Sequence, residues 1–402
     1  MDMNFDNFEF SQGSLSRLLD DERRLLPHCP ISFEGTVRAC SPEHTLARVR
    51  PHLRSMGITR VTHIGGLDSI GIPVAICYRP NSRHLSSGQG KGYSRQFAEV
   101  SAVMECVEGF HIEQPKERAL RGIYNELTES YRLVDPTKLS SGYFATHDLK
   151  QHCLDWCAAT DLLTGKSVYI PACLTRIDFS DYCPETNLLS ITSNGLASGN
   201  LLVEAICHAI LEIVERDCLA TWDRSSQSNK ERTRIDLDSI DSPIIREVIA
   251  RFVQADNEVI LWNVSNELQI PSINCGALSP LGYHGGSGAH YNKDIAILRA
   301  LAETAQARAV WISGSRDDLY PERYLRQLQR KPGNTHSSGS YDYSRISHLN
   351  SPASFQETFE VLCSKLQAHG YGEILTINHT IPRFNIPVVQ VFIPGMAIDH
   401  DR

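Results

Sequence analysis

The sequence lacks the features that would place a chain of this size in a membrane or outside a cell. No apolar run is long enough to span a bilayer, and the start, MDMNFDNFEF, is acidic rather than signal-like. The 39 Lys and Arg against 47 Asp and Glu give a net charge of −8, which argues against non-specific binding of nucleic acid. We therefore predict a cytoplasmic protein that binds neither membranes nor nucleic acid.

Closely spaced cysteine pairs are also scarce, although the chain has 12 cysteines. Cys106 and Cys207 lie inside apolar helical runs, where a thiol behaves as a small hydrophobic group. The scattered distribution indicates a reducing compartment rather than a disulfide scaffold. Cys153 and Cys157, beside His152, are spaced more widely than C-x-x-C and have no second pair nearby, so a zinc site is disfavoured.

What the sequence does contain is a buried helix with one polar stripe. From Ser193 to Asp217, a segment with two glycines leads into a helical run that is apolar almost all round. Because each residue advances about 100° around a helix, Glu204, His208, Glu212 and Glu215 share one face. Burying three carboxylates side by side is costly unless positive charge compensates them. The stripe therefore indicates a cation site; the alternative, a solvated acidic face, is disfavoured by the flanking apolar residues.

The same arrangement occurs twice more. Glycine-rich loops predicted at 86–92 and 285–290 each precede an apolar helical run. Both runs carry polar residues at i, i+4 and i+7, the spacing of a single helix face: Ser101, Glu105 and Glu108, then Arg299, Glu303 and Gln306. Such spacing of the units suits duplicated subdomains around a shared site rather than a solenoid. Carboxylate stripes meeting there would form an oxygen-lined cluster for Mg²⁺ with a nucleotide's phosphates.

These segments resemble the YcaO family, ATP-dependent enzymes that activate the backbone amides of peptides. The resemblance covers most of residues 33–395. Its motifs are specific when taken together: RVTHIGGLDSIGIPV at 60–74, SSGQGKGYSRQFAEVSAVMECVEG at 86–109, SNGLASG…ERD at 193–217, and GSGAHYNKDIAILRALAETAQAR with ISGSRDDL at 286–319. One departure is Gly109, where many relatives carry Arg or His after the second Glu.

The resemblance implies ATP and Mg²⁺ as cofactors and assigns the site residue by residue. The expected metal ligands are Glu105, Glu108, Glu204, Glu212 and Glu215. The expected nucleotide contacts are Ser101, Asn200 and Arg216, to which we add Lys91 and Arg316 as candidates. Glu105, Glu215 and Arg216 form the expected catalytic set.

Each of four residues in these segments has two possible roles. Lys91 is either a phosphate ligand or an exposed residue of a tight turn. Arg299 is expected to form a core ion pair with Glu303, the alternative being a nucleotide contact, and Arg316 has the same ambiguity. His208 is expected to pair with a glutamate, the alternative being a contact with substrate.

The expected fold is α/β or α+β, with mixed β-sheets packed on long buried helices in pseudo-repeated subdomains. The core repeats lie around 60–112, 190–220 and 273–320, within a YcaO-like catalytic domain at 31–402. Residues 1–30 are predicted to form an N-terminal arm. The stretch from 331 to 351, rich in Ser, Gly and Pro, is predicted to be a loop that acts as a lid or binds substrate.

The resemblance implies modification of a ribosomally made precursor peptide. Cyclodehydration of Cys, Ser or Thr to azolines is the first expectation. Thioamide formation with external sulfide and a TfuA-like partner is the alternative, and a non-catalytic nucleotide- or peptide-binding subunit is the rival class. The sequence lacks the proline-rich tail of many azoline-forming relatives, which predicts a distinct or partner-dependent branch. The expected partners are an E1-like, TfuA-like or dehydrogenase protein and a second copy of this chain.

Overall fold

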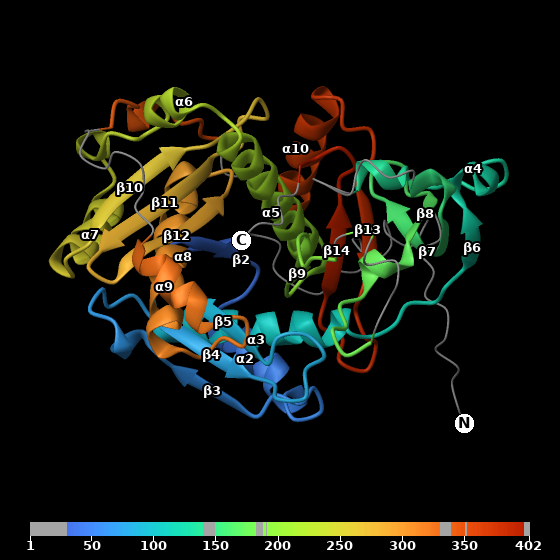
Figure 1. Ribbon diagram of the computed structural model, residues 1–402, viewed down its shortest axis with the longest axis horizontal. Helices are drawn as coiled ribbons and strands as arrows, with labels where there is room; N and C mark the ends of the chain where they lie inside the picture. Colours follow the sequence, from blue (N-terminus) through green and yellow to red (C-terminus); the bar gives the residue numbers. More distant parts are fainter. Residues whose placement is uncertain are drawn as a thin grey trace.

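A computed structural model describes residues 30–139, 149–181, 188–189, 191–329, 339–349 and 352–397 (Figure 1). Most of the arm predicted at 1–30 and part of the loop predicted at 331–351 lie outside these residues. The expected α/β fold is confirmed. None of the helices in the described ranges is both long and apolar enough to cross a bilayer.

The named strands pair antiparallel throughout. They form a two-stranded hairpin and three larger sheets. The hairpin is β1 (Ile31–Phe33) with β2 (Thr36–Arg38), and the first sheet is β3 (Arg60–His63), β4 (Val74–Tyr78) and β5 (Ser87–Lys91). The six-stranded sheet is β6 (Leu120–Ile123), β7 (Cys153–Asp161), β13 (Leu375–Asn378), β14 (Val388–Phe392) and β9 (Leu196–Ser198) in that order, with β8 (Ser167–Pro171) beside β7. The last sheet is β10 (Glu258–Asn263), β11 (Ser272–Ser279) and β12 (Gly282–Ala289).

Three long helices carry the predicted polar stripes: α3 (Arg95–Ile112), α5 (Leu202–Asp223) and α8 (Lys293–Ser313). Helix α3 packs on β4 and β5, α8 on β11 and β12, and α5 on β9 and β14. Figure 1 shows α5 between the β10–β12 sheet and the six-stranded sheet, with α3 below it. The other α-helices of the described residues are α2 (Pro42–Val49), α4 (Tyr124–Leu127), α6 (Gln227–Arg232), α7 (Pro243–Gln254), α9 (Pro321–Gln329) and α10 (Phe355–Ala368).

The structure corrects the prediction of glycine-rich loops before these helices. Residues 87–91 and 282–289 are strands β5 and β12, and each lies directly against the helix that follows it. A Cβ placed on Gly90 would come within 2.1 Å of the Ala102 nitrogen and the Ala98 oxygen of α3. A Cβ on Gly288 would come within 2.4 Å of the Ala296 oxygen of α8. The glycines therefore allow close contact between strand and helix, rather than a flexible turn.

This contact predicts that Gly90→Ala destabilises the protein. The new methyl group overlaps backbone atoms of α3, which have no side-chain rotamer with which to move aside, so we expect a loss of about 1–3 kcal/mol or more. Gly66→Ala is the matched control, because nothing lies within 4 Å of its Cβ position. Thermal unfolding measures both variants; equal melting temperatures would contradict the proposed packing role of Gly90.

Candidate active site

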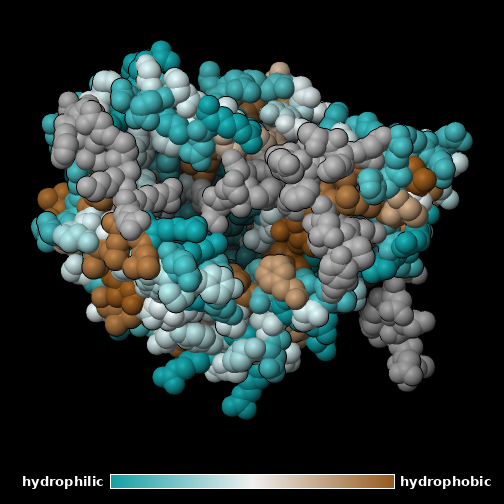
Figure 2. Space-filling view, viewed as in Figure 1, coloured by the Kyte–Doolittle hydropathy of each residue, from teal (hydrophilic) through white to brown (hydrophobic). Residues whose placement is uncertain are grey.

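The polar stripes of α3, α5 and α8 line one cavity of about 670 Å³. Figure 2 shows a hollow near the centre of one face of the molecule. All ten residues predicted to bind metal or nucleotide lie on the cavity wall: Lys91, Ser101, Glu105, Glu108, Asn200, Glu204, Glu212, Glu215, Arg216 and Arg316. The structure thus brings the predicted residues together from three units, while their individual roles stay predictions.

Two carboxylates of the stripes are bound to strands of a different unit. Glu108 of α3 accepts hydrogen bonds from the N–H and the hydroxyl of Ser198 in β9, at 2.8 and 2.6 Å. Glu215 of α5 accepts from the Ser287 hydroxyl at 2.6 Å and from the Ala289 N–H at 2.9 Å, both in β12. These bonds link α3 to the strand beside α5, and α5 to the strand beside α8.

Helix α8 completes this cyclic arrangement by bonding back to β5. Its Gln306 amide donates to the Gln89 carbonyl at 3.3 Å, and its Glu303 carboxylate lies 2.8 Å from the Lys91 ammonium. Each helix therefore reaches the strand of the next unit, and the cavity lies where the three units meet. Since Gln306 occupies the i+7 position that holds Glu108 and Glu215 in the other units, the third unit lacks one carboxylate.

Burial shapes the charge state of the carboxylates on α3. It raises the pKa of Glu105 to about 7 and the pKa of Glu108 to about 8. Hydrogen bonds act in the opposite direction, from the Gln89 N–H to Glu105 at 2.7 Å and from Ser198 to Glu108. Near pH 7, Glu105 is therefore partly ionised and Glu108 mostly protonated in the free protein, and a nearby cation would shift both carboxyl groups to the ionised form.

Glu204 has a capping role that the sequence analysis did not predict. Its side chain is only 1% exposed, and its two oxygens accept from the N–H groups of Asn200 at 2.8 Å and Ala39 at 3.3 Å. It thereby satisfies a backbone donor at the start of α5 and ties the helix to the segment after β2. Arg38 lies in the same part of the cavity wall, where burial lowers the pKa of its guanidinium and the nearby Glu204 partly offsets that effect.

The segment around α2 supplies site residues that sequence reasoning missed. Thr45 donates to the side-chain oxygen of Asn200 at 3.0 Å, and Arg48 donates to the Asn200 carbonyl at 2.9 Å. Arg38 and Thr45 both line the cavity. They follow no helical stripe and no glycine motif, and the nearest sequence signal is the Ser41–Pro42 start of α2, where the Ser41 side chain caps the helix.

The structure also settles the contacts of the residues with two interpretations. Arg299 lies 3.2 Å from the imidazole of His208, a contact that neither interpretation of these two residues predicted. Glu303 takes Lys91 as its cation because that lysine projects from the neighbouring strand β5 rather than from an exposed turn. The guanidinium of Arg316 forms a bidentate pair with Asp318, at 2.7 and 2.6 Å.

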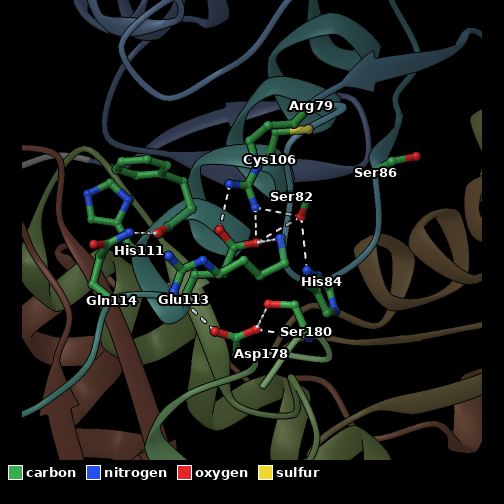
Figure 3. Close-up of polar contacts among 12 residues, drawn as sticks. Arg79, Ser82, His84, Ser86, Cys106, His111, Glu113, Gln114, Asp178 and Ser180 are labelled. Carbon is green, nitrogen blue, oxygen red and sulfur yellow. Dashed lines mark hydrogen bonds and ion pairs between the residues drawn. The ribbon is translucent and has the colours of Figure 1, made fainter. Parts of the chain in front are cut away.

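A buried ion pair fixes the C-terminal end of α3, the helix that carries Glu108 (Figure 3). Arg79, directly after β4, pairs with Glu113, the residue that caps α3. Glu113 also accepts from the Ser82 hydroxyl and the Arg83 N–H, each at 2.8 Å. Because Ser82 in turn accepts from the His84 N–H at 3.2 Å, this network places His84 in the cavity wall.

Comparison with known proteins identifies the family. The family model described as YcaO cyclodehydratase, binding ATP and Mg²⁺, matches residues 89–397. The chain belongs to the YcaO family. An uncharacterized protein from the tfuA 3′ region of Rhizobium leguminosarum bv. trifolii is 33% identical, over 90% of this chain and 89% of its own. A protein of Methanothermobacter thermautotrophicus is 30% identical over 90% of this chain and 95% of its own.

Solved YcaO structures share the fold. The YcaO protein of Methanopyrus kandleri, bound with AMPPCP and Mg²⁺, superposes with a TM-score of 0.72 at 24% identity, over 92% of this chain and 95% of that one. A heterocyclase in complex with substrate and cofactor gives a TM-score of 0.73 at 22% identity; the match covers 93% of this chain and 55% of that longer one. The expectation that this is an ATP- and Mg²⁺-binding family is confirmed.

The donor set of the cavity fits Mg²⁺ with a nucleotide better than Mg²⁺ alone. The sequence predicted one carboxylate cluster, but within the described ranges no three His, Cys, Asp or Glu side chains converge to hold a metal. The carboxylates of the polar stripes are instead distributed around the wall, where Glu105 and Glu108 are buried carboxyl groups that a cation would ionise. This arrangement suits Mg²⁺, which takes a few carboxylates and completes its coordination with phosphate oxygens and water.

Proposed function

We propose that this protein uses ATP and Mg²⁺ to activate backbone amides of a ribosomally made peptide. The observation that carries the proposal is the cavity whose wall holds both buried carboxylates and cationic side chains. Carboxylates suit Mg²⁺, and Arg or Lys side chains suit the phosphates that accompany it. The YcaO family supplies the reaction class, an ATP-dependent modification of peptides.

In the proposed reaction the oxygen of the peptide amide leaves as phosphate. A nucleophile adds to the amide carbon, and the amide oxygen attacks the terminal phosphorus of ATP, so ADP departs. The carbon–oxygen bond then breaks, and the electron pair leaves with the oxygen on inorganic phosphate. With sulfide as nucleophile, amide, H₂S and ATP give thioamide, ADP and phosphate, and no oxidant is needed.

The chain's own residues would hold and orient the reactants. Glu105, Glu108 and Glu212 are the carboxylates placed to hold Mg²⁺, which when bound neutralises charge on the phosphates. Two arginines of the cavity wall would supply positive charge for the phosphates, Arg38 from β2 and Arg216 from α5. Since the chemistry resides in the substrates, catalysis here consists mainly of positioning and charge neutralisation.

Thioamide formation is the product class that the comparisons favour. The relative from the tfuA 3′ region matches nearly the whole length of this chain at 33% identity. The heterocyclase structure is more distant, at 22% identity, and this chain covers 55% of it. We therefore place the thioamide ahead of the azoline that the sequence analysis put first, and infer a TfuA-like protein as partner.

The proposed function predicts a peptide product that carries sulfur in place of a backbone oxygen. The protein is incubated with the precursor peptide, a TfuA-like partner, ATP, Mg²⁺ and sulfide, and the product is weighed by mass spectrometry. With a heavy-oxygen label in the peptide carbonyl, the label should appear in the released phosphate. Chelation of Mg²⁺ should abolish both results.

The other outcomes separate the alternatives. Loss of one water from a Cys-, Ser- or Thr-containing peptide without sulfide would restore the azoline as product. ATP binding without any peptide-dependent turnover would support the non-catalytic subunit instead.

A further inference from the structure

The end of the cavity formed by β12 and the C-terminal half of α8 differs from the rest. Apart from Arg316, its wall carries neutral side chains: His284, Gln306, Val310, Trp311 and Leu319. The arginines of this region are neutralised by aspartates, with Arg308 lying 3.0 Å from Asp68 and Arg316 lying 2.6 Å from Asp318. The neutral end therefore suits an uncharged polar group rather than phosphates.

Three polar side chains at the neutral end hold buried atoms that form no hydrogen bond within the described part of the chain. These atoms are both ring nitrogens of His284, the amide oxygen of Gln306 and the indole nitrogen of Trp311. His284 is only 3% exposed. Buried polar groups of this kind are costly, and three on one cavity wall point to a ligand that supplies their partners.

The three groups are held in place by their surroundings. The rings of His284 and Trp311 meet edge to face with centroids 5.4 Å apart, and Trp311 also packs on Tyr324 at 5.0 Å. Gln306 is anchored by its own amide nitrogen, which donates to the Gln89 carbonyl at 3.3 Å. The indole N–H and the Gln306 oxygen are therefore a fixed donor and a fixed acceptor in one wall.

The donors and acceptors available define the ligand. The indole offers only a donor, the Gln306 oxygen only an acceptor, and a neutral imidazole offers one of each. Burial, and secondarily Arg308, lowers the pKa of His284 to about 4, so its ring is neutral near pH 7. A phosphate needs several donors and a compensating charge, whereas a peptide unit presents one carbonyl acceptor and one N–H donor.

We propose that His284, Gln306 and Trp311 form a subsite that holds the substrate through a backbone amide unit. The indole N–H donates to the amide oxygen, and the Gln306 oxygen accepts from the amide N–H. The subsite rests on the proposed function only in taking a peptide as the substrate. It assigns the peptide to the α8 and β12 end of the cavity and leaves the charged end for Mg²⁺ and phosphates.

The experiment uses N-methylacetamide, the smallest trans peptide unit, as the probe. The chain has four tryptophans, so its indole N–H groups are few in a proton–nitrogen correlation spectrum, and Trp311→Phe identifies the signal of Trp311. We expect that signal to shift saturably with the probe and not with inorganic phosphate. Trp311→Phe should weaken probe binding about fivefold, as loss of one neutral hydrogen bond predicts.

Controls separate the subsite from a structural role and from the proposed reaction. Trp311→Phe removes a donor that has no partner within the described residues, so its melting temperature should fall only by what the smaller ring loses in packing on His284 and Tyr324. Trp222→Phe is the contrast, because that indole donates to Thr233 at 3.0 Å; it should lower the melting temperature without affecting the probe. A second variant, His284→Phe, removes both ring nitrogens and should also weaken probe binding. If it does not fold, Trp311→Phe is sufficient for the test.

The subsite would be overturned if the Trp311 signal did not move with N-methylacetamide, moved equally with phosphate, or if Trp311→Phe bound the probe as wild type does. Its failure is distinct from failure of the proposed function. If the probe binds at Trp311 but ATP is never consumed with a peptide, the subsite is supported and the proposed reaction is contradicted. If the wild-type protein forms thioamide and Trp311→Phe has an unchanged KM for the peptide, the reaction is supported and the subsite is contradicted.

Discussion

Glu108→Gln is expected to abolish peptide modification, by about 100-fold or more, while leaving the protein folded. The amide oxygen of glutamine can still accept the hydrogen bonds that Ser198 donates, so the link between α3 and β9 survives. What is lost is a buried negative charge on the cavity wall, where we place Mg²⁺. Turnover of ATP with the peptide measures the effect, and calorimetry with Mg²⁺ and ATP measures binding.

Stability distinguishes a ligand role for Glu108 from a structural one. Burial raises its folded-state pKa to about 8, above the value of an unfolded glutamate, so the ionised group costs stability at pH values above the unfolded pKa. In chelator, Glu108→Gln should therefore melt at a higher temperature than wild type near pH 8. The difference should shrink as the pH falls toward about 5, where the wild-type carboxyl is protonated.

The matched control lies on the same helix. Glu99 of α3 is outside the cavity wall, and its ion pairs within the described residues are long, at 3.9 Å to Arg50 and 3.8 Å to His63. Glu99→Gln should keep full activity and nearly unchanged stability. An active Glu108→Gln enzyme, or one that is inactive only because it melts early, would contradict the assignment of Glu108 to Mg²⁺.

Substitution of Glu215 is a less specific test of Mg²⁺ binding than its position on the polar stripe suggested. Its two oxygens accept from Ser287 and Ala289 in β12, and its carboxylate lies 3.3 Å from Arg216. Glutamine at 215 would place an N–H₂ group beside a guanidinium or a backbone N–H. Loss of activity in Glu215→Gln would therefore mix a missing charge with a weakened contact between α5 and β12.

The helices of the site could be predicted because their signal is local. An apolar run with polar residues at i, i+4 and i+7 is visible in the sequence, and α3, α5 and α8 follow it. The partner of each polar residue is not local. Glu303 and Lys91 are far apart in the chain, and only the tertiary arrangement shows that Lys91 lies beside Glu303 and that Arg299 lies beside His208.

The glycine-rich segments show where a composition rule gives the wrong structure. Glycines usually mark loops, yet in β5 and β12 they are strand residues whose missing side chains admit a helix. Likewise, the neutral end of the cavity has no sequence signal, because His284 comes from β12 and Trp311 from the last turns of α8. Arg38 joins the site only because Glu204 ties the segment after β2 to the start of α5.

Glu113→Gln is expected to cause the largest loss of stability, about 3–5 kcal/mol, because it leaves a buried guanidinium without its counter-charge. Arg79 is 3% exposed and Glu113 is 4% exposed, so water cannot replace the lost partner. Glu113 receives hydrogen bonds from Arg79, Ser82 and Arg83, and a glutamine would turn an N–H₂ group toward some of these donors (Figure 3). Thermal and denaturant unfolding both measure the loss.

A surface pair and a double variant make this prediction specific. Glu247 and Arg251, one turn apart on α7, lie 2.6 Å apart with side chains 64% and 41% exposed, so Glu247→Gln should cost less than about 1 kcal/mol. Adding Arg79→Met to Glu113→Gln removes the uncompensated charge, and the double variant should be more stable than Glu113→Gln alone. If the loss in unfolding free energy of the double variant instead equalled the sum of the losses of Arg79→Met and Glu113→Gln, the two residues would contribute to packing independently. A coupled result means that one buried pair holds the end of α3, and with it the position of Glu108 in the cavity wall.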